Sequence, residues 1–137
     1  MHTKQIYITG ASGFIGSHLI NKMKKKGLLF FPISRKKNDE ANILTIKDYN
    51  DLNPVNKSTL VHLAENNNVN EAENIGDAFI SENMENVNKL VKKKWENIIY
   101  ISTVLLYDFD KKDKTSTTNS YKVKANSIYK KSKLECE

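Results

Sequence analysis

Three glycines at three-residue spacing separate an apolar segment from an amphipathic one, and this motif constrains the fold more than any other part of the chain. Residues 5–9 predict a strand, and the residues that follow the motif have the periodicity of a helix. Gly10 permits a tight turn, Gly13 lets a pyrophosphate approach the backbone, and Gly16 lets the helix pack close to the sheet. The start of the helix presents unpaired N–H groups and a positive dipole end to an anion. The motif predicts a dinucleotide-binding turn, and a glycine-rich turn without a ligand is the alternative.

Apolar runs alternate with amphipathic segments along the chain. The runs predict further strands at 28–33, 43–46, 60–64 and 98–102, with weaker pairing near Pro32. Helices are expected between Phe14 and the terminator Gly27, after the polar stretch 65–74, and from about Ser127. This alternation predicts an α/β fold with a doubly wound parallel sheet of strand order 3-2-1-4-5. The first helix is expected to bury an apolar stripe of Phe14, Ile15, Leu19, Ile20 and Met23.

Composition limits the class of protein. The 137 residues, of which 39% are hydrophobic, fit a single domain with a modest core. No apolar run has the length of a membrane span, and the first strand begins too early to leave room for a signal peptide. Cys136 is the single cysteine and has no partner for an internal disulfide, so we expect a cytoplasmic protein. The three histidines and Cys136 are scattered, which predicts no metal site.

The net charge of +6 raises the question of nucleic-acid binding, because clustered lysines neutralise phosphates. The lysines, however, fall in separated groups at 24–26, 92–94 and 111–114. The first two groups lie at the ends of predicted helices, where cations complement the helix dipole. We therefore expect no nucleic-acid partner and no membrane partner.

The glycine motif, with Thr9 before it and Phe14 and Ile15 inside it, resembles the TGxxGFIG signature of the extended short-chain dehydrogenases/reductases. The resemblance covers nearly the whole chain and implies a Rossmann-type domain that binds NAD or NADP. Members of this family continue into further strands and a C-terminal substrate domain. Residues 1–137 are thus expected to form an incomplete dinucleotide-binding domain without that substrate domain. The implied cofactor contacts of the motif are Gly10, Ser12, Gly13, Phe14, Ile15 and Gly16.

A Tyr-x-x-x-Lys pair near the C-terminus is the candidate catalytic pair. Because the chain has 6 tyrosines and is rich in lysine, about one such match is expected by chance in 137 residues. Tyr107 with Lys111 forms a second match. Tyr129 and Lys133 are favoured because they lie on a predicted helix, where this spacing places both side chains on one face. Their segment also resembles the family's YxxSKxxxE sequence. A lysine ammonium beside a tyrosine favours the phenolate and suits general acid–base catalysis, and Lys133 is implied to bind the nicotinamide ribose as well.

Thr103 is the third candidate catalytic residue. It follows the fifth predicted strand and precedes Tyr107 by four residues, which resembles the family pattern S-[ST]-x-x-x-Y. By that resemblance its hydroxyl binds the substrate oxygen on which Tyr129 acts. Sugar-nucleotide 4,6-dehydratases carry an acidic pair directly after this threonine, whereas this chain has Val104 and Leu105, which disfavours that reaction.

Further cofactor contacts are implied by shorter matches to the family. Leu63 and Ala64 follow His62 in a segment similar to the HxAA end of strand four, although Glu65 replaces the second small residue. We interpret His62 as a core histidine. Asn42 and Ile43 lie in a segment that resembles the adenine-binding segment of the family. Asn83 lies in a segment that resembles the one whose asparagine supports the backbone of the active site.

The end of the second predicted strand determines the expected cofactor. NAD-binding folds place Asp or Glu there to hold the ribose hydroxyls, but this chain has no carboxylate before Asp39. Arg35, alone or with Ser34 and Lys36, is suited to a 2′-phosphate, so NADP is favoured over NAD. The alternative is that Arg35 only covers the adenine ring.

These residues together predict an NAD(P)-dependent oxidoreductase or epimerase that acts on a nucleotide sugar by hydride transfer with Tyr129, Lys133 and Thr103. Epimerase, reductase and dehydratase activities stay open, and a homodimer is the candidate assembly. The alternative is a non-catalytic dinucleotide-binding or redox-sensing module, or an inactive fragment.

Overall fold

The computed structural model describes residues 4–37, 42–107 and 124–137, so the predictions for Asp39 and Lys111 lie outside the described residues. Its strands are β1 (Ile6–Thr9), β2 (Phe30–Ser34), β3 (Leu44–Thr45), β4 (Ser58–His62) and β5 (Trp95–Tyr100). Its helices are α1 (Phe14–Lys25), α2 (Val69–Ile75), α3 (Asp77–Val91) and α4 (Ile128–Glu135), with two short 3-10 helices, η1 (Tyr49–Asp51) and η2 (Val104–Leu106).

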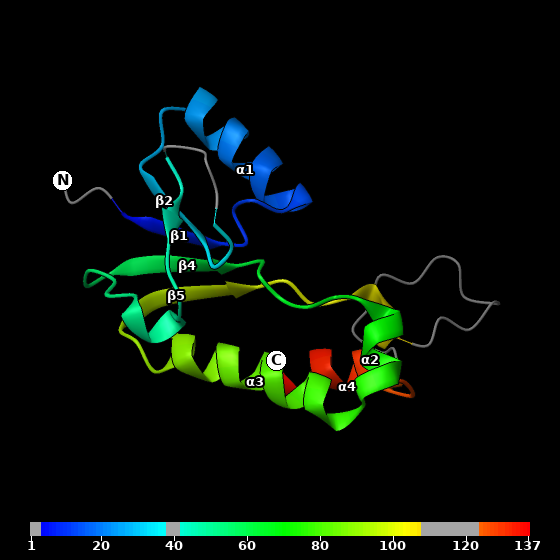
Figure 1. Cartoon of the computed structure of the whole chain (residues 1–137). Coiled ribbons are helices and arrows are strands. Elements are labelled where there is room, and N and C mark those ends of the chain that lie inside the picture. The colour runs from blue at the N-terminus through cyan, green and yellow to red at the C-terminus, as the bar shows by residue number, and fades with distance from the viewer. Residues whose placement is uncertain (1–3, 38–41, 108–123) are drawn as a thin grey trace. The chain divides into compact units, whose positions relative to one another are not determined.

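All five strands form one parallel sheet with the order β3-β2-β1-β4-β5, which confirms the predicted fold (Figure 1). β1 lies at its centre and pairs along its whole length with both neighbours, so that Tyr7 lies opposite Phe31 on one side and Leu60 on the other. The carboxyl ends of the strands therefore meet at one edge of the sheet. In open parallel sheets this edge is where ligands bind.

Contacts between residues group the chain into two compact units. The first unit contains the described residues up to Glu65 together with 85–101, and so holds the whole sheet, α1, η1 and the second half of α3. The second unit contains 66–84 and the described residues from Ser102 onward. Within it, α4 packs against α2 and η2.

Two apolar clusters cover the two faces of the sheet in the first unit. On one face, Ile20 and Met23 of α1 pack against Ile8 and Ala11. The predicted stripe of α1 is only partly correct, because Phe14 is 81% exposed and Ile15 is 58% exposed. These two residues begin the helix beyond the edge of the sheet, and the core face starts with Gly16.

The opposite face is covered by η1 and by the second half of α3. Tyr49 of η1 and Leu90 of α3 pack with Tyr7, Ile33 and Leu60 in the larger cluster. The sequence analysis assigns no helix or strand to the segment around Tyr49, yet Tyr49 is 1% exposed and belongs to the largest buried side chains. The tyrosine is buried because η1 folds back over the sheet.

The bounds of β2 differ from the prediction. Leu28 and Leu29 precede the strand and are exposed, while pairing continues through Pro32 to Ser34. The Ser34 carbonyl accepts a hydrogen bond from the Ile46 N–H on the β3 side. Pro32 lies two residues earlier and has the same orientation, so its missing N–H faces a position that β3 has not yet reached.

The bounds of β4 and β5 shift by two or three residues and those of β1 and β3 by one, and one helix is new. β4 begins at Ser58 and β5 at Trp95, earlier than their apolar runs suggest. The stretch 65–74, expected to be irregular, contains most of α2, which Asn68 caps through its side chain. Gly76 ends α2 with a φ of 59° and separates it from α3. The described helices are all too short or too polar for a bilayer-spanning segment.

Candidate dinucleotide-binding and catalytic site

The three glycines of the motif have different surroundings. Gly10 has a φ of +71°, and a Cβ there would lie 2.9 Å from the Ala64 nitrogen. A Cβ on Gly16 would lie 2.1 Å from the Gly10 carbonyl oxygen. A Cβ on Gly13 would meet only that same oxygen, at 3.2 Å. The protein's own backbone thus requires glycine at positions 10 and 16, whereas at position 13 it leaves space.

The first turn of α1 has the features of an anion site. Gly13 is its N-cap residue and has no side chain to accept a hydrogen bond from the helix, and the first turn contains no acidic residue. By contrast, the N-cap residues of α2 and α4 are Asn68 and Ser127, and in both cases the side chain accepts a hydrogen bond from the helix backbone. The start of α1 is therefore left to interact with a negatively charged group.

Hydrogen bonds tie the glycine motif to the end of β2. The Ala11 N–H donates to the Ile33 carbonyl at 3.2 Å, and the Ser12 and Ser34 hydroxyls lie 3.1 Å apart. The Ser34 hydroxyl is also within 3.1 Å of the Lys36 backbone nitrogen. A hydroxyl thus stands at the end of β2, where NAD-binding folds commonly place a carboxylate.

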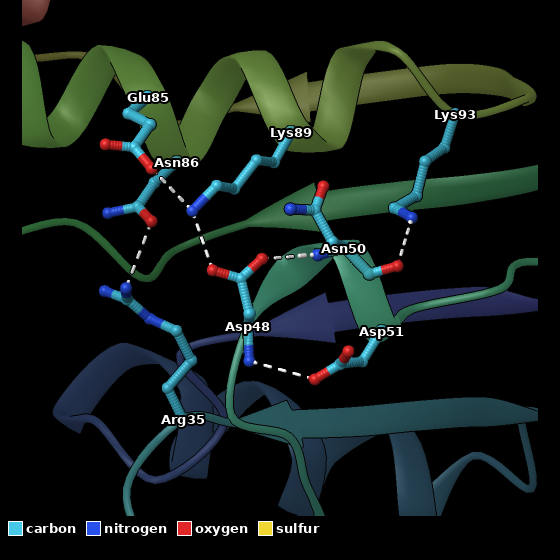
Figure 2. Close-up of polar contacts among 8 residues, drawn as sticks. All are labelled: Arg35, Asp48, Asn50, Asp51, Glu85, Asn86, Lys89 and Lys93. Carbon is cyan, nitrogen blue, oxygen red and sulfur yellow. Dashed lines mark hydrogen bonds and ion pairs between the residues drawn. The ribbon is translucent and has the colours of Figure 1, made fainter.

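Arg35, the next residue, lies against the face of the sheet that α3 covers. Its Nη1 donates to the Asn86 Oδ1 at 3.1 Å, as Figure 2 shows, and its Cζ lies 5.0 Å from the centre of the Tyr49 ring. Burial raises the pKa of the Tyr49 hydroxyl, and the positive charge of Arg35 opposes part of that rise. Sequence reasoning did not identify either partner of Arg35.

The end of β4 supports the motif from the other side. The Thr9 hydroxyl and the His62 Nδ1 are 2.7 Å apart, and the Leu63 N–H donates to the Thr9 Oγ1 at 3.2 Å. His62 is 2% exposed, as expected for a core histidine. The Tyr100 hydroxyl donates to the Glu65 carboxylate at 2.7 Å, so β5 holds the residue that follows Ala64.

The remaining predicted cofactor contacts of the first unit lie after β4 (Leu63 and Ala64) and directly before β3 (Asn42 and Ile43). Ile43 and Leu63 both pack on the apolar cluster beneath α1, and Ala64 packs on the cluster of the opposite face. Asn42 is exposed. In the described part of the chain, no group of three or more His, Cys, Asp or Glu side chains is arranged to hold a metal ion.

The second unit holds the predicted catalytic residues. Tyr129 is half-buried near the start of α4, and Lys133 follows one turn later and is 8% exposed. The N-terminus of α4 is fixed by the Ser127 side chain and by Glu73, whose carboxylate accepts the Ile128 N–H at 3.0 Å. The helical spacing therefore places Tyr129 and Lys133 on one face of α4.

Thr103 caps η2 in the same unit. Its Oγ1 accepts the Leu105 N–H at 3.3 Å, and its own O–H remains chemically able to donate to a substrate oxygen. The neighbouring Ser102 hydroxyl is hydrogen-bonded to the Glu137 carboxylate. Tyr107, the tyrosine of the competing motif, follows η2 outside any helix and is 43% exposed.

Asn83 is 2% exposed and uses its side-chain amide within the second unit. Its Nδ2 donates to the Ser132 Oγ at 3.0 Å and to the Asn66 carbonyl at 3.2 Å, while its Oδ1 accepts the Asn66 N–H at 3.3 Å. Ser132 lies between Tyr129 and Lys133 in the sequence of α4, so Asn83 supports the helix that carries them. Sequence reasoning did not single out Ser132 or Asn66.

A sequence model of the NAD dependent epimerase/dehydratase family matches residues 6–137. The chain belongs to this family. A search of curated protein sequences found no match. The family assignment agrees with the resemblance predicted from the glycine motif.

Solved structures of similar fold include RMD from Pseudomonas aeruginosa complexed with NADPH, which has a TM-score of 0.77, 20% sequence identity and 98% coverage of this chain. The UDP-glucose-4-epimerase from Stenotrophomonas maltophila, with bound NAD and formylated UDP-arabinopyranose, has a TM-score of 0.74, 16% identity and 96% coverage. The UDP-N-acetylglucosamine 4-epimerase from Bacillus cereus has a TM-score of 0.71, 23% identity and 97% coverage. This member of the epimerase/dehydratase family spans 46% of the length of each of the three.

Proposed function

We propose that the chain binds a nicotinamide dinucleotide at the carboxyl edge of its sheet. The observation that carries this proposal is the start of α1: Gly13 leaves space above an N-terminus that has neither a side-chain cap nor an acidic residue in its first turn. A pyrophosphate would accept hydrogen bonds from the N–H groups there and interact with the helix dipole. Similar structures contain NAD or NADPH, which supports this ligand class.

We further propose that Thr103, Tyr129 and Lys133 act on the hydroxyl or carbonyl group of a nucleotide sugar. Tyr129 takes the hydroxyl proton of the substrate as a hydride leaves the same carbon, and it returns a proton in the reverse step. Lys133 favours the phenolate form of Tyr129, and Thr103 donates a hydrogen bond to the substrate oxygen. The bound nicotinamide supplies the hydride acceptor. Similar structures with UDP-sugar ligands support this substrate class.

We propose NADP as the preferred cofactor. Ser34 and Arg35 stand at the end of β2, where NAD-binding folds place a carboxylate that accepts hydrogen bonds from both ribose hydroxyls. Neither a serine hydroxyl nor a guanidinium can replace that pair of acceptor oxygens. The guanidinium of Arg35 is suited to bidentate contacts with a 2′-phosphate.

The test combines binding with turnover. The chain is titrated with NADPH and NADH while nicotinamide fluorescence is followed, and it is then assayed with UDP-sugars for epimerisation and for cofactor reduction. Tight dinucleotide binding with turnover supports the proposals on dinucleotide binding and on catalysis. Binding without turnover on any UDP-sugar favours the non-catalytic alternative, and the absence of binding contradicts the assignment of the α1 site.

A further inference from the structure

We propose that Asn86 and Tyr49 hold the guanidinium of Arg35 as the group that distinguishes a 2′-phosphate from the ribose hydroxyls. This inference rests on the proposed dinucleotide binding and goes beyond it, because it assigns cofactor selection to two residues outside the glycine motif. Both are positioning residues that act through Arg35. Neither is expected to contact the cofactor itself.

The geometry restricts the guanidinium on two sides. The Tyr49 ring lies beneath it, with 5.0 Å between the ring centre and Cζ, and Asn86 accepts one hydrogen from Nη1. An arginine side chain has five N–H donors in a planar group, and a ring contact of this kind fixes the plane without using any donor. Four donors remain, and those of Nε and Nη2 share one edge of the plane, which suits bidentate contact with a phosphate.

The η1 turn that carries the Tyr49 ring is fastened to α3. Asp48 and Asp51 form a reciprocal capping box at the start of η1. The Asp48 carboxylate also accepts a hydrogen bond from the Lys89 ammonium at 2.7 Å (Figure 2). Lys93 donates to the Asn50 carbonyl at 3.0 Å. The η1 turn is therefore fastened to the same helix that carries Asn86.

The charges around Arg35 preserve its attraction for an anion. In the part of the chain that the structure describes, Asp48 is a carboxylate whose charge interacts with Arg35, but Lys89 pairs with it and lowers its pKa. Among the described residues, no ion pair involves Arg35. Its hydrogen-bond partner is a neutral amide, which orients the guanidinium without neutralising it. An aspartate at position 86 would hold Arg35 equally well but would cancel its charge.

That difference gives the experiment. Asn86→Asp keeps the shape of the side chain and a hydrogen bond to Arg35, so the fold should persist. We expect the Kd for NADPH to rise about tenfold or more and the Kd for NADH to stay within about twofold, because only NADPH needs an uncompensated guanidinium. Asn88→Asp is the matched control: it adds the same charge to an exposed position of α3, and both Kd values should stay near wild type.

A second pair of variants tests the ring. Tyr49→Phe keeps the ring and removes a hydroxyl that has no hydrogen-bond partner among the described residues, so the ratio of the two Kd values should not change. Tyr49→Leu removes the ring, and the preference for NADPH should fall about two- to fivefold. This pair decides the question if Asn86→Asp fails to fold.

The outcomes separate this inference from the proposed function. If the wild-type chain binds neither cofactor, dinucleotide binding itself is contradicted. If it binds both and Asn86→Asp weakens them equally, or strengthens NADPH binding, then dinucleotide binding stands and the role of Asn86 is wrong. A Tyr49→Leu variant with unchanged preference likewise overturns the role of the ring.

Discussion

Substitution of the motif glycines by alanine should separate ligand binding from folding. Gly13 has a φ of −79° and a ψ of 172°, a conformation open to any residue. Its new Cβ would have one close neighbour, the Gly10 oxygen at 3.2 Å, which needs a shift of a few tenths of an ångström. Alanine also restricts the unfolded chain, so the free energy of unfolding of Gly13→Ala should change by less than about 1 kcal/mol.

Gly16→Ala should have the opposite effects. Its Cβ would lie 2.1 Å from the Gly10 oxygen, and ordinary contact at 3.4 Å requires the helix or the turn to move by the difference of 1.3 Å. Both atoms belong to packed backbone, so we expect a destabilisation at or above the upper end of about 1–3 kcal/mol. The Tm should fall by several degrees.

The two variants should differ in NADPH affinity in the opposite order to their stability. The methyl group of Gly13→Ala would lie where a pyrophosphate must approach the first turn of α1. Charge-assisted hydrogen bonds contribute about 1.5–3 kcal/mol each, so the loss of one or two of them should raise the Kd for NADPH by about 10- to 100-fold or more. Thermal unfolding and nicotinamide fluorescence titration measure the two effects on the same samples. A folded Gly13→Ala variant that binds NADPH as tightly as wild type would refute the assignment of this turn.

Three further predictions concern catalysis, cofactor choice and pH. Tyr129→Phe should lower kcat on a nucleotide-sugar substrate by about 10²-fold or more with cofactor affinity unchanged, whereas Tyr107→Phe should be mild; equal losses would contradict our choice of motif. Arg35→Asp should weaken NADPH binding more than NADH binding in the same titration, and tighter NADH binding by the wild-type chain would count against NADP. The hydrogen bond from Lys89 lowers the pKa of Asp48, so this pair stabilises the fold at neutral pH, and its contribution is lost as the pH falls through the lowered pKa. In urea unfolding, Lys89→Met should therefore reduce the loss of stability at acid pH. An unchanged dependence of stability on pH would show that the pair contributes nothing.

Local patterns in the sequence predict the fold well. The glycine motif and the alternation of strands and helices depend on neighbouring residues, and together they predict the sheet order that the structure shows. The break between α2 and α3 was also visible in principle, because Asn68 is a good N-cap residue and Gly76 a good terminator. The apolar pattern does not predict it because four of the seven residues of α2 are polar and the helix buries only Ala72.

The contacts around Arg35 could not be predicted in the same way. Arg35 and its partner Asn86 are separated by 51 positions, and neither residue type by itself indicates which side chain it contacts. Tyr49 stands in a turn-rich segment whose composition suggests exposure, and only the return of η1 over the sheet buries it. Side-chain partners of this kind depend on tertiary structure, which a single sequence does not specify by its local pattern.

Helix α3 contributes to both units, and its two halves support different parts of the proposed chemistry. Its second half carries Asn86 and Lys89, which hold Arg35 and the η1 turn. Its first half carries Asn83, which holds Ser132 of α4 between Tyr129 and Lys133. Substitution of Asn86 should therefore change the preference between NADPH and NADH, whereas substitution of Asn83 should lower turnover with that preference intact. The two readouts would be independent only if each half acts through the contacts described here, because a general weakening of α3 would change both together.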